Sequence, residues 1–432
     1  MLLMRRASSV LVSLGAICLA VVLIEAAGRA LLTPAPLAYG RLLGRDLPPF
    51  RVVPACDQPP APADPSAPYR DLTVDGQRIT VGDLHGMFRE DPVLGYAPRE
   101  GAVSANGWWQ SDNLGARERN DAAAVPEAGR MRIVAFGESF GAGSRVKQEQ
   151  VWSSVLARAL PNTEVLNFAV DGYSMAQAYL RFRQVRQKVK YDLAVMVFVP
   201  KADPPRDINV YRPLLSRDWL LYAVLPRYVI DNGALTLVPR PDQTEAAFVA
   251  ANCRGISTPL RAHLAAFDRF YVDAEYRQEP PILGRSLLYK LGVASYANLL
   301  RGRVASTMTR PDSEAVRVTN GMFRQMDGDA RRDGSRFVLI LLPLESELQP
   351  LARESAGRTR WRALAELLCG KPMLCIDLAD YLPGVPPGEI DRGYDGTHYG
   401  PSANRLIGEF VARQLRHNGA IASPDKIGHY DR

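Results

Sequence analysis

The chain has 432 residues, of which 47% are hydrophobic, and its formal net charge is +7. The apolar fraction is enough for a large buried core and argues against a wholly disordered chain. The basic residues are scattered and form no dense cluster interleaved with aromatic residues, so a nucleic-acid-binding protein is not expected.

An apolar segment lies near the start of the chain. Arg5 and Arg6 precede the run from Ser8 to Ile24, which is almost wholly apolar. Such a run is close to the shortest helix that can span a bilayer, and the two arginines would stay on the cytoplasmic side. We therefore expect residues 1–30 to be an uncleaved membrane anchor that places the rest of the chain in the periplasm. A cleavable signal peptide is the alternative.

Four cysteines follow the apolar segment, at positions 56, 253, 369 and 375. An even number of cysteines in an exported region favours disulfide bonds. Cys369 and Cys375 are close enough for a local disulfide, which leaves Cys56 to pair with Cys253. The alternative is four buried free thiols. No spacing of cysteine and histidine resembles a zinc site, and neither a metal nor another cofactor is expected.

Residues 31–130 are predicted to form a tether and a strap ahead of the main domain. Thr33 to Pro68 is rich in proline and alanine, which is typical of an irregular tether. The stretches DPVLGY, from Asp91, and SDNLGAR, from Ser111, are expected to be ordered segments that contain turns.

From residue 131 onwards, short apolar strands alternate with helices. The strands are predicted at 132–136, 164–168, 193–199, 337–342 and 373–378. The helices are predicted at 150–160, 174–189 and 402–416. This alternation predicts an α/β fold with a mainly parallel five-stranded sheet covered on both faces, a three-layer α/β/α sandwich.

This α/β domain is expected to span residues 131–420 and to be interrupted by a large insertion at 204–334. The insertion contains two helical stretches, at 258–271 and 285–300. We place it beside the functional site, because loops at the carboxyl ends of parallel strands build such sites. Residues 421–432 are expected to be a C-terminal tail.

A serine follows the first predicted strand of the domain, in the stretch GESFG that begins at Gly137. Ser139 could be a nucleophile at a sharp corner or only a polar turn residue. A nucleophilic serine needs a base, and His398 follows Asp395 by three residues in a loop before the last helix. Asp395 could orient the ring of His398 and stabilise its charged form.

A glycine after the second strand completes the predicted site. Gly172 can present a backbone N–H at the same end of the sheet, so it could form an oxyanion hole with the N–H of Ser139. An ordinary turn glycine is the alternative. GESFG also fits the nucleophile elbow of α/β-hydrolases, but that elbow follows several strands, whereas Ser139 follows the first.

These motifs resemble those of the SGNH, or GDSL-like, hydrolase family. The stretch from Gly137 to Phe140 is similar to the first block of the family, Gly172 to the second, and Asp395-Gly-Thr-His398 to the last. The stretches around SDNLGARERN and RIVAFGESF also resemble bacterial membrane-anchored, exported members. The resemblance extends from Asp91 to about Leu415, with the insertion poorly matched.

The resemblance implies a flavodoxin-like α/β/α sandwich and the hydrolysis or transfer of acyl esters. It implies that Ser139 is the nucleophile, His398 the base and Asp395 the residue that orients it. Two positions depart from the family. Glu138 stands where the first block has aspartate, and Ala202 stands where the third block supplies an asparagine to the oxyanion hole.

Alanine has no side-chain donor, and the loss of one oxyanion donor typically costs about 2.7–4 kcal/mol of transition-state stabilisation. Either Lys201 or another group replaces the asparagine, or the enzyme is slow, or it no longer catalyses. We expect an exported serine esterase or acyltransferase for ester-linked acyl groups, with the O-acetyl groups of an envelope or exported polysaccharide as substrate. The alternative is a non-catalytic carbohydrate-binding or polysaccharide-assembly protein on a degenerate scaffold.

Overall fold

The computed structural model describes residues 2–35, 37–53, 56, 72–74, 77–79, 87–104, 107–215, 223–353, 355–371, 373–393 and 395–421. The chain divides into two units, each built from two separate stretches of sequence. Met1–Pro62 and Glu245–Ser306 form one, here called the N-terminal unit. Ala63–Thr244 and Thr307–Arg432 form the other, here called the sheet unit.

Five parallel strands form the centre of the sheet unit. They are β8 (Met131–Phe136), β9 (Thr163–Asn167), β10 (Leu193–Phe198), β13 (Arg336–Leu341) and β14 (Leu374–Asp377). Each strand end lies within one residue of its predicted position, because buried strands stand out in the sequence as short apolar runs. Their order is β14-β13-β10-β8-β9, which is the 2-1-3-4-5 order of flavodoxin-like folds seen from the other edge.

The strand order reverses between β8 and β10, which lie side by side in the sheet. Ser139 follows β8, and the loop after β10 leads into the short helix α6 (Pro204–Asp207). In open α/β sheets, ligands bind outside the carboxyl ends of the strands at this reversal. The topology therefore places Ser139 and the loop after β10 where a binding site is expected.

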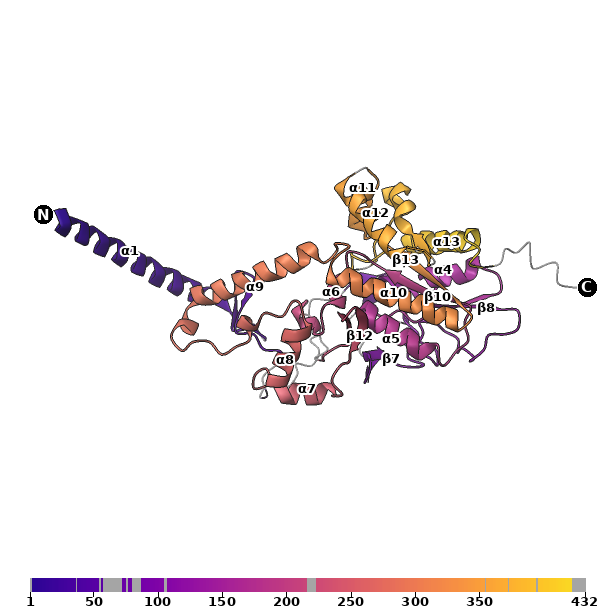
Figure 1. The fold of residues 1–432 in the computed structure, drawn as a ribbon, viewed down its shortest axis with the longest axis horizontal. Helices are drawn as coiled ribbons and strands as arrows, with labels where there is room; N and C mark the ends of the chain where they lie inside the picture. Colours follow the sequence, from indigo (N-terminus) through magenta and orange to yellow (C-terminus); the bar gives the residue numbers. More distant parts are fainter. Residues whose placement is uncertain are drawn as a thin grey trace, which may run out of the picture. The chain divides into compact units, whose positions relative to one another are not determined.

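Helices cover both faces of the sheet (Figure 1). They are α4 (Trp152–Ala159), α5 (Met175–Val185), α10 (Glu314–Arg332), α11 (Glu345–Leu351), α12 (Ala356–Leu368) and α13 (Pro401–His417). α4 and α13 share a hydrophobic core with Ile133 and Ala135 of β8. α5, α10 and α12 share the other core with Val134 and Phe136. Successive side chains of the strand thus point to opposite faces, as the pleat requires.

The strap segment is part of the core of the sheet unit. The hairpin of β6 (Phe88–Asp91) and β7 (Gly95–Pro98) places Leu94, Tyr96 and Ala97 in the cluster that also contains the inner face of α5. Asp91 Oδ1 accepts hydrogen bonds from the backbone N–H groups of Val93 and Leu94, at 2.9 and 2.8 Å. These bonds close the turn that the sequence DPVLGY predicts.

The N-terminal unit joins the start of the chain to residues of the predicted insertion. Its elements are α1 (Leu2–Ala30), β1 (Leu32–Thr33), β2 (Gly40–Leu42), β3 (Arg45–Leu47), α7 (Glu245–Asn252), α8 (Thr258–Phe267) and α9 (Leu287–Thr307). The carboxylate of Glu25 accepts hydrogen bonds from the N–H groups of Leu287 and Leu288, at 2.9 and 3.0 Å. A carboxylate is favourable at a helix N-terminus, so Glu25 fastens α1 to the start of α9.

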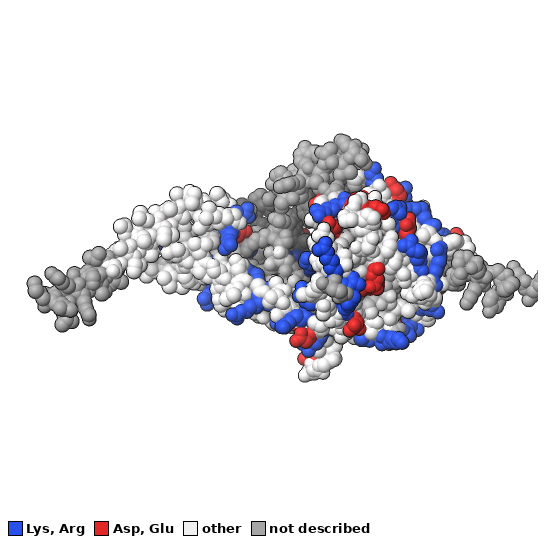
Figure 2. Space-filling model, turned by 90° about the horizontal axis from the view of Figure 1, so that it is seen from above, with Lys and Arg blue, Asp and Glu red and all other residues white. Residues whose placement is uncertain are grey.

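α1 contains the apolar segment for which we expected a membrane anchor. No Lys, Arg, Asp or Glu occurs between Ser13 and Ile24, and the middle part of this helix is white in Figure 2. Within the part of the chain that the structure describes, no helix combines the length and the hydropathy needed to cross a membrane.

The structure divides the predicted insertion 204–334 between the two units. Residues 245–306 belong to the N-terminal unit, whereas the hairpin of β11 (Arg227–Asp231) and β12 (Ala234–Val238) and helix α10 belong to the sheet unit. α10 packs against the sheet with Val318, Met322 and Phe323 in its core. The sequence shows that α10 is amphipathic but not which surface its apolar face covers.

The structure contains both predicted disulfide bonds. Cys56 is bonded to Cys253 across a sequence separation of 197 residues, and Cys369 is bonded to Cys375 across a separation of 6. Cys18 is free and exposed. Of the tether predicted at 33–68, residues 36, 54, 55 and 57–68 lie outside the described residues, as does the predicted tail beyond residue 421. The described part of the tether contributes to the three-stranded antiparallel sheet of β1, β2 and β3.

Candidate active site

Ser139 stands at a tight corner after β8. Gly137 has a φ of +151°, which residues with a side chain rarely adopt. A Cβ atom at this position would lie 2.9 Å from the carbonyl oxygen of Val197, so the close approach to the neighbouring strand also requires glycine. Ser139 begins the short helix α3 (Ser139–Ala142), which Glu138 caps by accepting a hydrogen bond from the N–H of Phe140 at 2.8 Å. The corner places the serine hydroxyl at the carboxyl end of the sheet.

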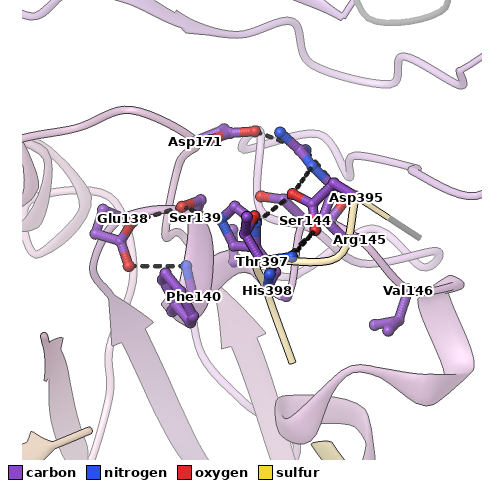
Figure 3. A network of polar contacts seen from close by, with 12 residues as sticks. Glu138, Ser139, Phe140, Ser144, Arg145, Val146, Asp171, Asp395, Thr397 and His398 are labelled. Atoms are coloured by element: carbon purple, nitrogen blue, oxygen red, sulfur yellow. Dashed lines mark hydrogen bonds and ion pairs between the residues drawn. The ribbon is translucent and has the colours of Figure 1, made fainter. Parts of the chain in front are cut away.

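The structure brings Ser139, His398 and Asp395 together, although 259 residues separate the serine from the histidine (Figure 3). His398 Nε2 lies 2.7 Å from Ser139 Oγ, and His398 Nδ1 lies 2.5 Å from Asp395 Oδ2. With the Nδ1 proton donated to Asp395, Nε2 is available to accept the serine proton. The ring of Phe140 packs on the imidazole at a centroid distance of 4.4 Å and limits its movement.

Asp395 is held as a carboxylate by its surroundings. Its Oδ1 accepts hydrogen bonds at 3.0 Å from the backbone N–H groups of Thr397 and His398. Burial raises the pKa of Asp395, but the hydrogen bond and charge of His398 outweigh burial, and with the backbone bonds they hold that pKa far below its ordinary value. Asp395 therefore remains negative throughout the pH range in which His398 could act as a base.

Gly172 lies in the loop after β9, at the same end of the sheet as Ser139. Its φ is +75°, and the N–H of Val170 donates to the carbonyl of Gly137 at 3.1 Å, which ties this loop to the serine corner. Within the described residues, the backbone N–H groups of Ser139 and Gly172 have no hydrogen-bond acceptor. Two such N–H groups at one sheet end are the donors that an oxyanion hole requires.

Arg145 links the loop of Gly172 to the loop of His398. Its Nη1 binds Asp171 Oδ2 at 2.8 Å, and its Nε binds Asp395 Oδ2 at 3.1 Å. Burial raises the pKa of Asp171, but the charge of Arg145, followed by that of His398, keeps that pKa below its ordinary value. The two carboxylates and the guanidinium fix the positions of two loops that come from distant parts of the sequence (Figure 3).

Glu138 is a second neighbour of the serine hydroxyl. Its Oε2 lies 2.5 Å from Ser139 Oγ, and its side chain is fully buried. A serine hydroxyl has one proton, so it can donate to His398 or to Glu138 but not to both. The replacement of aspartate by the longer glutamate thus has a direct consequence, because the carboxylate competes with the base for the proton of the nucleophile.

The residues after β10 form a buried charge cluster around Arg206. Arg206 Nη1 contacts Glu138 Oε2 at 3.4 Å and Asp203 Oδ1 at 3.1 Å, and both carboxylates are fully buried. Burial, followed by the charge of Glu138, raises the pKa of Asp203 well above its ordinary value. Ala202 has no donor to offer, and the exposed Lys201 extends to Ser346 Oγ, at 3.5 Å.

Sequence reasoning predicted Gly172 and the three residues that the structure brings together, but neither Arg145 nor Arg206. The triad residues lie in short motifs with a fixed spacing, whereas the two arginines are brought to the site only by the folding of their loops. Arginine is frequent along this chain, so neither residue stands out by type. The one available signal was the three charged residues in DPPRD, directly after the position of the missing asparagine.

Comparison with protein-family models and with curated proteins finds no match for this chain. The solved structures similar to it include hydrolases of the G-D-S-L lipolytic family. A member from Desulfitobacterium hafniense DCB-2 is 13% identical, with a TM-score of 0.32, and the match covers 66% of this chain and 100% of that one.

Two further solved structures are similar at the same level. The lipase/acylhydrolase from Enterococcus faecalis is 13% identical, with a TM-score of 0.31, over 67% of this chain and 96% of that one. A two-domain esterase active on acetylated mannans is 10% identical, with a TM-score of 0.29, over 68% of this chain and 51% of that one. Likenesses this low carry no conclusion about activity, which has to come from the site itself.

Proposed function

We propose that this protein is a serine esterase or acyltransferase that acts on ester-linked acyl groups. The observation that carries the proposal is the series of hydrogen bonds from Ser139 Oγ through both ring nitrogens of His398 to Asp395, with distances of 2.7 and 2.5 Å. Serine is an effective nucleophile only when a base accepts its proton. This arrangement supplies the base and the carboxylate that orients it.

In the first half of the reaction, Ser139 Oγ forms a bond to the carbonyl carbon of the ester while His398 Nε2 takes the serine proton. The carbonyl oxygen becomes an oxyanion that accepts hydrogen bonds from the backbone N–H groups of Ser139 and Gly172. The bond between the carbonyl carbon and the alcohol oxygen then breaks, and His398 returns the proton to the leaving alkoxide. Asp395 stabilises the charged imidazole throughout.

In the second half, a hydroxyl compound attacks the acyl-serine and loses its proton to His398. If the attacking molecule is water, a carboxylic acid is released. If it is a sugar hydroxyl, the acyl group is transferred. In both cases the bond to Ser139 Oγ breaks and the proton returns to the serine, so one set of residues serves both outcomes.

We further propose that the protein works outside the cytoplasm on O-acetyl groups of an envelope or exported polysaccharide. The export part is supported by Arg5 and Arg6 ahead of the apolar run and by two disulfide bonds, which persist in oxidising compartments. An anchor and a cleaved signal remain the two forms that the N-terminal segment could take. The substrate is proposed from the exported location and the ester chemistry together.

The proposal is tested with the second-order rate constant kcat/KM on a short-chain aryl acetate. Ser139→Ala and His398→Ala should each lower it by about 10⁴-fold or more, and the double variant should be scarcely worse, because the residues act as a unit. Asp395→Asn should cost less. Ser144→Ala is the matched control, since the buried hydroxyl of this nearby, half-buried serine has no partner among the described residues. If Ser139→Ala retains the wild-type rate, Ser139 is only a turn residue.

A non-catalytic carbohydrate-binding protein is the second candidate. It is favoured by Ala202, which lacks the expected donor, and by the contact of Glu138 with Ser139. A fluorophosphonate probe separates the two candidates, because it labels only an activated serine. Labelling that disappears in Ser139→Ala supports the enzyme. No labelling, together with polysaccharide binding measured by calorimetry, supports the binding protein.

A further inference from the structure

The open question of the site is which group replaces the asparagine that Ala202 lacks. The ammonium group of Lys201 lies 3.5 Å from Ser346 Oγ on α11, so it is directed away from Ser139. Arg206 is four residues beyond Ala202, on α6. Its guanidinium contacts Glu138, which precedes Ser139, and Asp203, which lies in the loop after β10.

α6 is fixed against the loop that carries Gly172. Asp207, next to Arg206, accepts a hydrogen bond from the N–H of Met175 at 2.9 Å and is also bonded to Thr319. Met175 is the first residue of α5, directly after the loop of Gly172. The backbone of Arg206 is therefore held beside the start of α5, directly after the loop of Gly172, and its position is set by the fully buried carboxylate of Asp207.

The carboxylate of Glu138 bridges the guanidinium of Arg206 and the hydroxyl of Ser139. Glu138 Oε2 contacts both Arg206 Nη1 and Ser139 Oγ, at 3.4 and 2.5 Å. Only Nη1 is used in the hydrogen bonds of Arg206 to described residues, so the donors on Nε and Nη2 remain available. The side chain of Arg206 is 24% exposed, whereas those of Glu138 and Asp203 are 0% exposed, so Arg206 is the member of this cluster that an incoming substrate can reach.

The charge of Arg206 extends across the site. Burial raises the pKa of Asp171, which precedes Gly172, and Arg206 is among the charges that lower it, after Arg145 and His398. Burial also acts against the charged form of Arg206 itself, but Glu138 and Asp203 outweigh it and raise the pKa of the guanidinium. Arg206 is thus a permanent cation whose charge acts on Asp171, in the loop of Gly172.

We propose that Arg206 is the third oxyanion donor of this site, and that a guanidinium N–H of Arg206 takes the place of the amide that Ala202 lacks. This inference rests on the proposed ester chemistry at Ser139. As Ser139 Oγ bonds to the carbonyl carbon, the negative charge on the carbonyl oxygen is shared by the N–H groups of Ser139, Gly172 and Arg206. A fixed cation stabilises this charge without further reorganisation, which is the condition for a strong effect in a site shielded from water.

The test measures two rates, kcat with an aryl acetate and the second-order rate of fluorophosphonate labelling, whose transition state also places negative charge on the oxygen. Arg206→Ala should lower both by about 100-fold with little change in KM, as expected for one oxyanion donor. Added guanidinium ion should restore part of the rate. Arg206→Lys should be intermediate, because it keeps the charge but loses the planar donors.

A double-mutant cycle separates this role from a structural one. Ala202→Asn should raise the rates at least 10-fold in the Arg206→Ala background but change them less than threefold in the wild type, because Asn and Arg206 would serve the same oxygen. A purely structural Arg206 predicts a lower Tm, no rescue by guanidinium and equal effects of Ala202→Asn in both backgrounds. Arg405→Ala, on the exposed surface of α13, controls for the loss of an arginine.

The outcomes also distinguish this inference from the proposed function. If Ser139→Ala abolishes labelling while Arg206→Ala labels within threefold of the wild type, the esterase stands and the role of Arg206 is overturned. If Ser139→Ala leaves labelling unchanged, both fail. If thermal unfolding shows that Arg206→Ala does not fold, Arg206→Lys is used in its place. Wild-type rates in Arg206→Lys, with no added effect of Ala202→Asn, would overturn the inference.

Discussion

At the scale of single residues, the ionisation of Asp395 is coupled to folding. Its carboxylate accepts bonds from His398, from two backbone N–H groups and from Arg145. These contacts exist only in the folded chain, so the folded state binds the Asp395 proton more weakly than the unfolded state does. A pKa that folding lowers contributes stability above the ordinary carboxyl pKa, and this stability is lost as the pH falls.

Asp395→Asn should therefore destabilise the protein in a pH-dependent way. We expect the Tm of the variant to lie below that of the wild type at pH 6–7, and the difference to shrink as the pH falls below about 4, where the unfolded carboxyl takes up its proton. Thermal unfolding of both proteins from pH 3 to pH 7 measures this. A Tm difference that stays constant over the whole range would contradict the lowered pKa of Asp395.

The triad could be predicted from the sequence because its parts lie in two short motifs, around Ser139 and His398. The arginines of the site could not. Arg145 reaches Asp171 and Asp395 only after three loops have met at the carboxyl end of the sheet. The competition of Glu138 for the serine proton was equally hidden, since it depends on a distance of 2.5 Å that one methylene group decides.

At the scale of elements, the strands were predicted well, but the packing of α10 on the sheet was not predicted. Strands such as β10, with every residue buried, are recognisable as apolar runs. α10 is also clearly periodic, but its position in the sequence, among residues of the predicted insertion, gave no indication that it covers the sheet. The periodicity of a helix fixes its apolar face, whereas the partner of that face is decided by contacts distant in sequence.

The two disulfides should differ in what they contribute to stability. In the chain-entropy account, a crosslink restricts the unfolded chain more when it closes a longer loop, and a typical contribution is about 2–4 kcal/mol. Cys56–Cys253 closes a separation of 197 residues and Cys369–Cys375 one of 6. We therefore expect Cys56→Ser/Cys253→Ser to lower the free energy of unfolding more than Cys369→Ser/Cys375→Ser does.

Denaturant unfolding of the two double variants measures this difference, with Cys18→Ser as the control because that thiol is free. Peptide mapping without reduction should show both linked pairs in the wild type. Equal losses in the two variants would argue that strain or residual structure, rather than loop length, sets the contribution of each crosslink. Freely alkylated cysteines at all four positions would contradict the pairing itself.

At the scale of the whole molecule, the division into two units is the feature that the sequence predicts least. The N-terminal unit is assembled from residues 1–62 and 245–306, and the bonds of Glu25 to the start of α9 hold these stretches together. The N–H of Phe50 also donates to the carbonyl of Glu275 at 2.7 Å. Such contacts leave no periodic pattern in either stretch. The boundaries predicted from composition, at 30, 130, 204 and 334, therefore differ from those of the two units, at 62, 244 and 306.

The proposed export of the whole chain is tested by reporter fusions after Ile421. Alkaline phosphatase becomes active only where its disulfides can form, so its fusion should be active and a β-galactosidase fusion inactive. Arg5→Glu/Arg6→Glu should reduce the phosphatase activity, because the basic residues ahead of the apolar run set its orientation. The N-terminal sequence of the exported protein then distinguishes an anchor from a cleaved signal, because an anchored protein retains Met1 or begins at Leu2.

An active β-galactosidase fusion with an inactive phosphatase fusion would place the site in the cytoplasm, where Cys56–Cys253 and Cys369–Cys375 would not persist. An exopolysaccharide could then no longer be the substrate.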